Sequence, residues 1–163
     1  MSSHWDSGGM LSRGMHAPAF ELKDLTGGRQ PLARILEKGP VLLAFFKVSC
    51  PVCQLAFPFL ERMSGNDGLQ VIAVSQDDTN ATKAFHQRFG ITLPTLLDEG
   101  REGYPVSNAY GISSVPSLFL IETDGAISHS FAGFSKLDFE SIGKRINVQP
   151  FRPDEYVPEF KSG

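Results

Sequence analysis

Residues 41–53 read VLLAFFKVSCPVC, and the elements on both sides can be placed from this stretch. Its first part, Val41 to Lys47, is a continuous apolar run of strand length, which is typical of a central strand covered on both faces. From Pro51 onward apolar residues recur at helical spacing as far as Gly65-Asn66. The stretch therefore predicts a buried strand that leads directly into a helix, with Cys50-Pro51-Val52-Cys53 where the helix begins.

Strand and helix patterns alternate along the rest of the chain. Strands are expected over 69–75, 117–122 and 126–132, and helices over 32–37, 79–89, 106–110 and 136–146. The alternation implies βαβ units and a mainly parallel sheet, to which the late hairpin around Asp124-Gly125 adds an antiparallel edge. The predicted fold class is α/β, a three-layer α/β/α sandwich. Its domain spans 14–146, between a flexible N-terminal tail (1–13) and an extended C-terminal tail (147–163).

Length, composition and charge exclude several classes of function. The 163 residues fit one domain, and 41% of them are hydrophobic. With 15 basic and 18 acidic side chains the net charge is −3, so there is no basic excess for nucleic acid. The longest apolar run is far shorter than the roughly 18 residues of a membrane span. The N-terminus shows no leader pattern, which favours the cytoplasm, or the periplasm if a leader was removed from this chain.

The two cysteines form a single C-x-x-C, a spacing typical of redox-active or metal-binding sites in a protein without a disulfide framework. Cys50 is expected at the helix N-terminus, where free N–H groups and the positive end of the helix dipole stabilise a thiolate. Cys50 is thus the predicted nucleophile. Cys53, one turn further along, is shielded yet close enough to resolve a mixed disulfide on Cys50.

Further stretches join this unit in order. They are Ala17-Pro18-x-Phe20-x-Leu22-x-Asp24, Pro58 in the helix, Val71-Ile72-Ala73-Val74-Ser75, Gly111-Ile112-Ser113-Ser114-Val115-Pro116, Phe119-Leu120-Ile121 and Asp124-Gly125. Over residues 14–146 this set resembles the thioredoxin-fold superfamily, and within it the TlpA-like thiol–disulfide oxidoreductases grouped with the AhpC/TSA (redoxin) family. The resemblance implies a thioredoxin-like sandwich with a central mixed sheet and an N-terminal extension.

The resemblance also implies a function. It implies a cis Val115–Pro116 bond whose backbone faces the cysteines and binds substrate. Cys50 and Cys53 would exchange disulfides with a protein or small-molecule substrate, and a thiol reductase would recycle the pair. No dissociable cofactor or metal is expected. Three positions depart from the pattern: Ala44 stands where thioredoxin has a buried aspartate, Ser49 where it has a tryptophan, and Ala56 where TlpA-like proteins often have a glutamate. No carboxylate is therefore evident to take the Cys53 proton.

Three alternatives stay open. The first is a peroxiredoxin-like thiol peroxidase with Cys53 as peroxidatic cysteine, although Phe46 and Cys50 replace the Pro and Thr/Ser of that motif and no arginine stands near Val115. The second is a zinc site, for which the cysteines supply two of about four ligands. The third is a non-catalytic binding module that keeps the fold as a scaffold.

The histidines are scattered without a ligand spacing and occupy positions 4, 16, 86 and 129. His86 and His129 are expected to face solvent, and His16 is the histidine that could approach the cysteine face.

Overall fold

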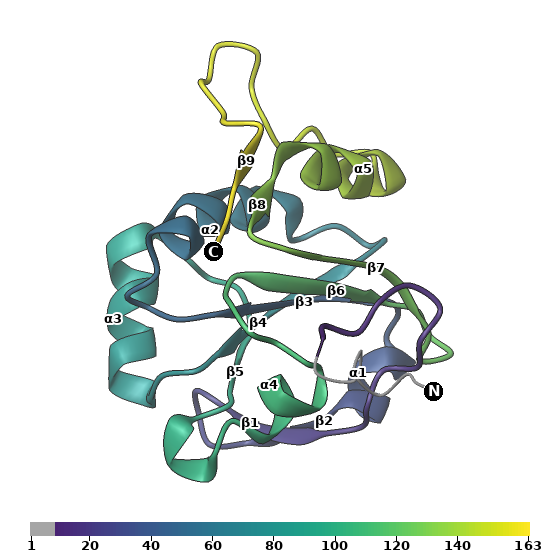
Figure 1. The fold of residues 1–163 in the computed structure, drawn as a ribbon, viewed down its shortest axis with the longest axis vertical. Helices are drawn as coiled ribbons and strands as arrows, with labels where there is room; N and C mark the ends of the chain where they lie inside the picture. The colour runs from purple at the N-terminus through teal and green to yellow at the C-terminus, as the bar shows by residue number, and fades with distance from the viewer. Residues whose placement is uncertain (1–8) are drawn as a thin grey trace.

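The computed structural model describes residues 9–163, and Figure 1 shows its fold. The strands are β1 (Glu21–Asp24), β2 (Arg29–Pro31), β3 (Val41–Phe46), β4 (Gln70–Ser75), β5 (Thr95–Leu97), β6 (Ser117–Ile121), β7 (Ile127–Ala132), β8 (Phe134–Ser135) and β9 (Phe160–Lys161). The helices are α1 (Leu32–Glu37), α2 (Pro51–Met63), α3 (Thr79–Phe89), the 3₁₀ turn η2 (Gly100–Glu102), α4 (Pro105–Ala109) and α5 (Lys136–Ile146).

Seven strands form one mixed sheet in the order β2-β1-β5-β4-β3-β6-β7. Only the pairings of β3 with β4 and of β4 with β5 are parallel; β1–β2, β1–β5, β3–β6 and β6–β7 are antiparallel. The mixed sheet of the predicted fold class is confirmed, but the expectation of a mainly parallel sheet was wrong. There are two reasons: β6 lies antiparallel to β3, and residues 21–31 add an antiparallel hairpin, β1–β2, beside β5.

β3 is an interior strand of the sheet, as its apolar run predicts. All six of its residues are buried, because β4 and β6 flank it and helices cover both faces of the sheet. In Figure 1 α2 and α5 lie above strands β3, β6 and β7, and α1 and α4 lie below these strands. Phe46 of β3 packs against Phe57 of α2 and Phe85 of α3, with ring centroids 4.4 and 4.9 Å away. This aromatic cluster fixes α2, and with it the cysteines, on the sheet.

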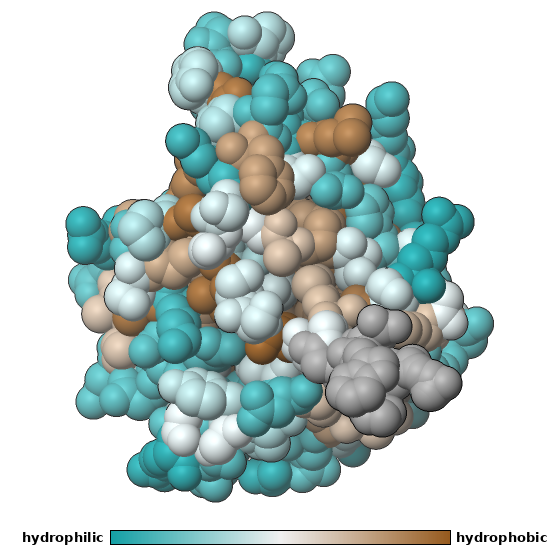
Figure 2. Space-filling model, viewed as in Figure 1, coloured by the Kyte–Doolittle hydropathy of each residue, from teal (hydrophilic) through white to brown (hydrophobic). Residues whose placement is uncertain are grey.

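The segment after α5 turns back over the molecule. Asn147 ends the helix in a left-handed conformation, and Phe151 then packs its ring on Phe59 of α2 at 4.9 Å. Tyr156 and Phe160 are exposed, so one of the three tail aromatics packs on the body and two do not. Figure 2 shows hydrophobic residues among hydrophilic ones on this surface. The tail ends in the short strand β9, which sequence patterns did not predict and which pairs with β8.

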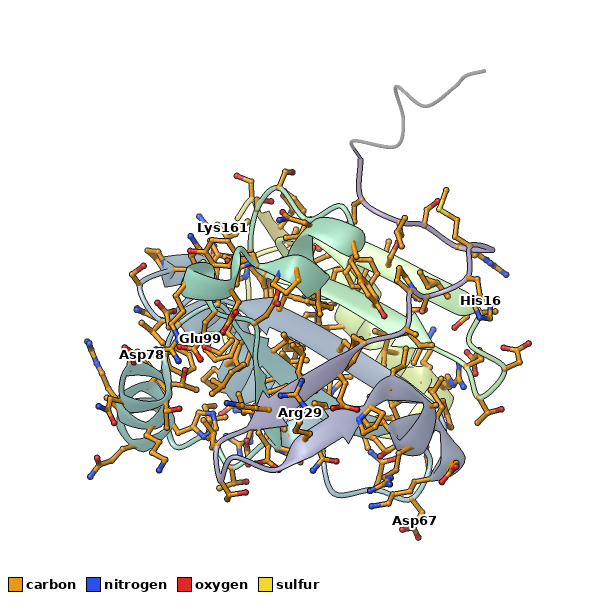
Figure 3. All side chains as sticks on the ribbon, turned by 90° about the horizontal axis from the view of Figure 1, so that it is seen from below. His16, Arg29, Asp67, Asp78, Glu99 and Lys161 are labelled. Carbon is orange, nitrogen blue, oxygen red and sulfur yellow. The ribbon has the colours of Figure 1, made fainter. Side chains whose placement is uncertain are left out.

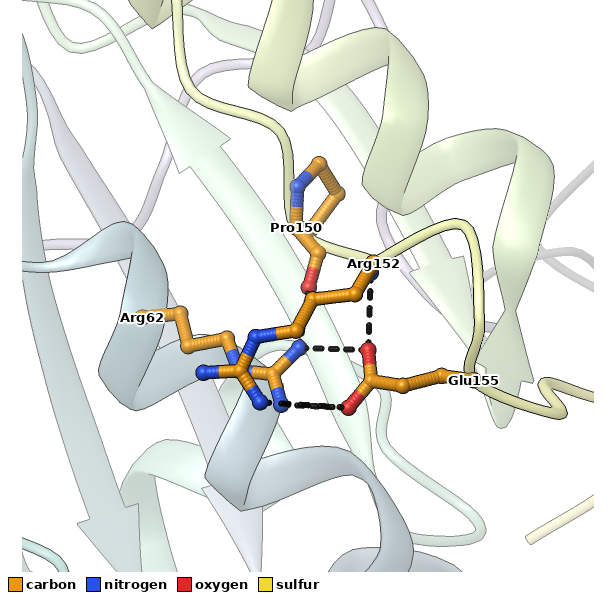
Figure 4. A network of polar contacts seen from close by, with 4 residues as sticks. All are labelled: Arg62, Pro150, Arg152 and Glu155. Carbon is orange, nitrogen blue, oxygen red and sulfur yellow. Dashed lines mark hydrogen bonds and ion pairs between the residues drawn. The ribbon is translucent and has the colours of Figure 1, made fainter.

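An ion pair fastens this segment to α2. Arg62 donates to both carboxylate oxygens of Glu155, with Nη1 2.7 Å from Oε1, and to the carbonyl of Pro150 at 3.0 Å (Figure 4). The backbone N–H of Arg152 donates to the same carboxylate at 2.8 Å. Residues 150–155 are therefore held on α2, which directs the chain that follows toward the cysteine end of that helix.

Among the described residues, no helix has both the length and the apolar character needed to cross a membrane.

Candidate active site

Cys50 stands at the N-terminus of α2. It is the N-cap residue with extended backbone (φ −82°, ψ 115°), and its Sγ accepts a hydrogen bond from the Cys53 N–H at 3.2 Å. Pro51 fills the first helical position, where a missing N–H leaves no bond unmade. The side chain of Cys50 is half-buried, whereas that of Cys53 is fully buried. The sulfur of Cys50 thus lies where helix N–H groups favour negative charge and where a substrate can reach it.

Cys53 is the opposite kind of thiol. Its burial raises the pKa of the thiol well above the ordinary value, because a buried thiolate loses its hydration. The nearby Cys50 and the carboxylate of Asp77 act in the same direction, and the backbone N–H of Lys47 acts against them. At neutral pH Cys53 is therefore a protonated, enclosed thiol beside an accessible one.

The loop around Pro116 contacts the accessible thiol. The Val115–Pro116 peptide bond is cis, as the family resemblance implies. The Cys50 Sγ donates to the carbonyl oxygen of Val115 at 3.4 Å, a contact between residues 65 positions apart. Ser117 Oγ donates to the Ser114 carbonyl at 2.7 Å and closes the loop locally. The predicted set Cys50, Cys53, Val115 and Pro116 is thus gathered in one place.

Asp77 is a member of this site that sequence patterns did not single out. Its carboxylate accepts the N–H of Val48 at 2.8 Å, and Gln54 donates to the carbonyl of Val48 at 3.0 Å. The loop before Cys50 is thereby held on both sides. The sequence did contain a signal for Asp77, because this residue follows β4, which is a parallel neighbour of β3. The carboxyl ends of β4 and β3 therefore lie side by side, and the cysteines follow β3. The negative charge of this carboxylate also contributes to raising the pKa of the Cys53 thiol.

A cavity of about 470 Å³ opens beside Cys50. One side is formed by Cys50 and Val115, and the other by α4 and the residue before it, Tyr104. The buried Asp98 fixes that second side, because its carboxylate accepts the N–H of Val106 at 3.1 Å and both the N–H and the hydroxyl of Ser107 at 2.7 Å.

Lys47, a positively charged residue beside this cavity, is exposed. Lys47 projects from the end of β3, with its ammonium 5.5 Å from the ring centroid of Tyr104.

The histidines do not join the cysteines. His16, the histidine that could have approached the cysteine face, lies instead at the turn of Gly125, and Figure 3 shows it on the other side of the molecule from Lys161. His86 and His129 are partly buried rather than solvent-facing, because His86 bonds Thr95 at 2.9 Å and His129 bonds Asp138 at 2.7 Å. Position 4 lies outside the described residues. Within residues 9–163 no group of three or more His, Cys, Asp or Glu side chains is arranged to hold a metal ion.

Known proteins are similar to this chain in sequence or in fold. The thiol-disulfide oxidoreductase ResA of Bacillus thuringiensis (strain Al Hakam) is 30% identical over 138 residues, 82% of this chain and 78% of that protein. A crystal structure described as a thiol:disulfide interchange protein DsbE from Chlorobium tepidum superposes with a TM-score of 0.72 at 28% identity, covering 84% of this chain and 96% of that one.

The peroxidoxin BcpB of Mycobacterium tuberculosis superposes with a TM-score of 0.69 at 20% identity, covering 84% of this chain and 95% of that one, which shows a shared fold alone. The model of the AhpC/TSA family matches residues 14–130. The chain therefore belongs to the AhpC/TSA family, within which its thioredoxin-like fold carries a C-x-x-C pair.

Proposed function

We propose that the protein is a thiol–disulfide oxidoreductase in which Cys50 is the attacking and Cys53 the resolving cysteine. The Cys50 thiolate attacks one sulfur of a substrate disulfide, the substrate S–S bond breaks, and the first thiolate leaves. Cys53 then loses its proton and attacks the Cys50 sulfur, which releases the second substrate thiol and leaves a Cys50–Cys53 disulfide. Two electrons pass from the cysteine pair to the substrate.

The observation that carries this proposal is the asymmetry of the pair. One sulfur is half-buried at a helix N-terminus in contact with the Val115 carbonyl, and the other is enclosed and kept protonated by burial. This asymmetry supports a fixed order of attack. It also opposes a peroxidase in which Cys53 meets peroxide, because such a thiol must be both reachable and ionised.

Substrate binding and recycling belong to the same proposal. The backbone of Val115, ahead of Pro116, is the candidate partner for a bound substrate segment. A separate thiol reductase restores the dithiol after each cycle. In a reducing compartment such as the cytoplasm, the net reaction is reduction of the substrate disulfide.

The test is the alkylation rate of each cysteine in the reduced protein, measured against pH by mass spectrometry. We expect fast labelling of Cys50 and slow labelling of Cys53 at neutral pH. Cys50→Ser should leave Cys53 slow, and Cys53→Ser should leave Cys50 fast. Fast labelling of Cys53 with a slow Cys50 would exclude these roles and favour the peroxidase.

A further inference from the structure

Residues 159–163, here called the strap, lead from β8 to the candidate active site, where Gly163 lines the cavity beside Cys50. The backbone of the strap pairs with the segment after β7: Lys136 N–H donates to the Glu159 carbonyl at 3.0 Å, and β9 is antiparallel to β8. In Figure 1 β9 runs alongside β8 toward the N-terminal end of α2. Beyond β9 the chain reaches the loop of Val115, so that Gly163 and Cys50 line the same cavity.

Two glycines make this close passage sterically possible. A Cβ on Gly163 would lie 2.0 Å from the carbonyl oxygen and 2.7 Å from the carbonyl carbon of Val115. A Cβ on Gly133 would lie 2.5 Å from the carbonyl oxygen of Lys161. Real Cβ atoms do not approach backbone this closely, so any larger residue at either position would push the strap off its path.

The strap therefore fills the space beside the Val115 backbone. An extended polypeptide that enters to pair with the Val115 backbone meets Gly163 there, and it must displace the strap, which β8 and Lys136 hold by backbone hydrogen bonds. A compact disulfide needs only the cavity that opens to Cys50 between Val115 and α4. The two kinds of substrate thus face different barriers at the same sulfur.

We propose that the strap is a specificity-determining segment that favours compact, low-molecular-weight disulfides over extended protein disulfides. This inference rests on the function proposed above, because it concerns access to the attacking Cys50. Protein substrates react only after the strap has left Val115.

The experiment compares two oxidants of the reduced protein: bis(2-hydroxyethyl) disulfide and a disulfide-linked unfolded peptide. Deleting residues 159–163 should raise the rate constant for the peptide about tenfold, which corresponds to about 1.4 kcal/mol. The same deletion should change the rate constant for bis(2-hydroxyethyl) disulfide by less than about twofold, well below the tenfold effect on the peptide. Gly163→Val should act in the same direction in the full chain, which guards against a folding defect of the deletion. Ser162→Ala, a change in the same segment without a clash, is the matched control and should have no effect.

The outcomes separate the two proposals. If neither rate changes on deletion, or if both rise equally, the discrimination by the strap is refuted while the oxidoreductase stands. If the intact protein reacts with neither disulfide, the proposed function itself fails.

A second measurement follows the strap directly. Cys53→Ser should trap a mixed disulfide between Cys50 and the peptide, in which the amide of Lys136 exchanges its hydrogen faster than in the free variant. Unchanged protection of that amide in the trapped complex would show that the strap stays in place, and would overturn the proposal.

Discussion

The Cys53 thiol makes the free energy of unfolding depend on pH. Burial raises the pKa of this thiol in the folded protein above the ordinary value of 9.0, so its contribution to stability is complete below pH 9. Above that pH the unfolded chain loses the proton while the folded one keeps it. Each further pH unit therefore removes up to about 1.4 kcal/mol of stability.

We expect the free energy of unfolding of the reduced protein to fall between pH 9 and 10.5 more steeply than that of Cys53→Ser. Urea unfolding at several pH values measures both slopes. The serine variant is matched in size and shares every other titrating group, including Tyr110. Equal slopes would show that Cys53 is not enclosed in solution.

Asp98 is a buried carboxylate that stabilises the fold by accepting hydrogen bonds from buried donors. Its carboxylate accepts two backbone N–H groups and one hydroxyl at the start of α4. Asp98→Ala should lower the free energy of unfolding by about 3 kcal/mol, because each buried donor left unpaired costs roughly 1–3 kcal/mol. Chemical denaturation checks this, with Glu102→Ala on the exposed η2 turn as a control expected to stay within about 0.5 kcal/mol. A loss below about 1 kcal/mol would mean that water replaces the carboxylate.

Helix α3 illustrates how one cap sets the beginning of an element. The Asp78 side chain accepts the N–H of Ala81 at 2.8 Å, and Gly90 closes the other end in a left-handed conformation. Asp78→Ala should destabilise the protein by about 1 kcal/mol, whereas Asp78→Asn, which keeps an acceptor, should be close to neutral. Thermal or urea unfolding distinguishes the two. Equal losses for both would assign the effect to charge rather than to the hydrogen bond.

The elements that were predictable from the sequence are those whose signals are local. β3 and α2 follow from an apolar run and a helical period, and the ends of α3 follow from its cap residues. β2 and β9 carry no such signal, because each has two or three residues and exists only through a partner distant in sequence.

The site divides in the same way. Cys50, Cys53, Val115 and Pro116 are recognisable from motifs, and the structure brings them together. Asp77 and the strap were not foreseen, because their place depends on how strand ends and the returning chain meet in space.

Across the whole molecule, the ion pair of Arg62 and Glu155 joins the returning chain to α2. Hydrogen bonds from Arg62 lower the pKa of Glu155 to about 2, so the pair is complete above the ordinary pKa near 4.5 and is lost as the pH falls toward 2. An NMR titration of the Glu155 carboxyl should therefore show a midpoint near 2, and Arg62→Gln should return it toward the ordinary value.

Glu155→Gln should loosen the same segment at neutral pH. We expect faster hydrogen exchange over residues 150–157, with β3 and β4 unchanged. Glu159→Gln removes the same charge from a carboxylate whose side chain is 86% exposed, and should leave the exchange of residues 150–157 as it is. Equal exchange in both variants would show that packing of Phe151, and not the ion pair, holds the segment.

The sheet has two outer strands, and the N-terminal segment lies along one of them. Gly14 N–H donates to the carbonyl of Ile127 at 2.9 Å, and Ile127 N–H donates to that of Met15 at 2.8 Å. The opposite border, β2, is three residues long and ends in Pro31, which has no N–H to offer. Unpaired strand borders invite aggregation, since a second chain can add to them. Residues 11–17 therefore shield this border, and removing them is expected to let β7 pair with strands of other copies of the chain.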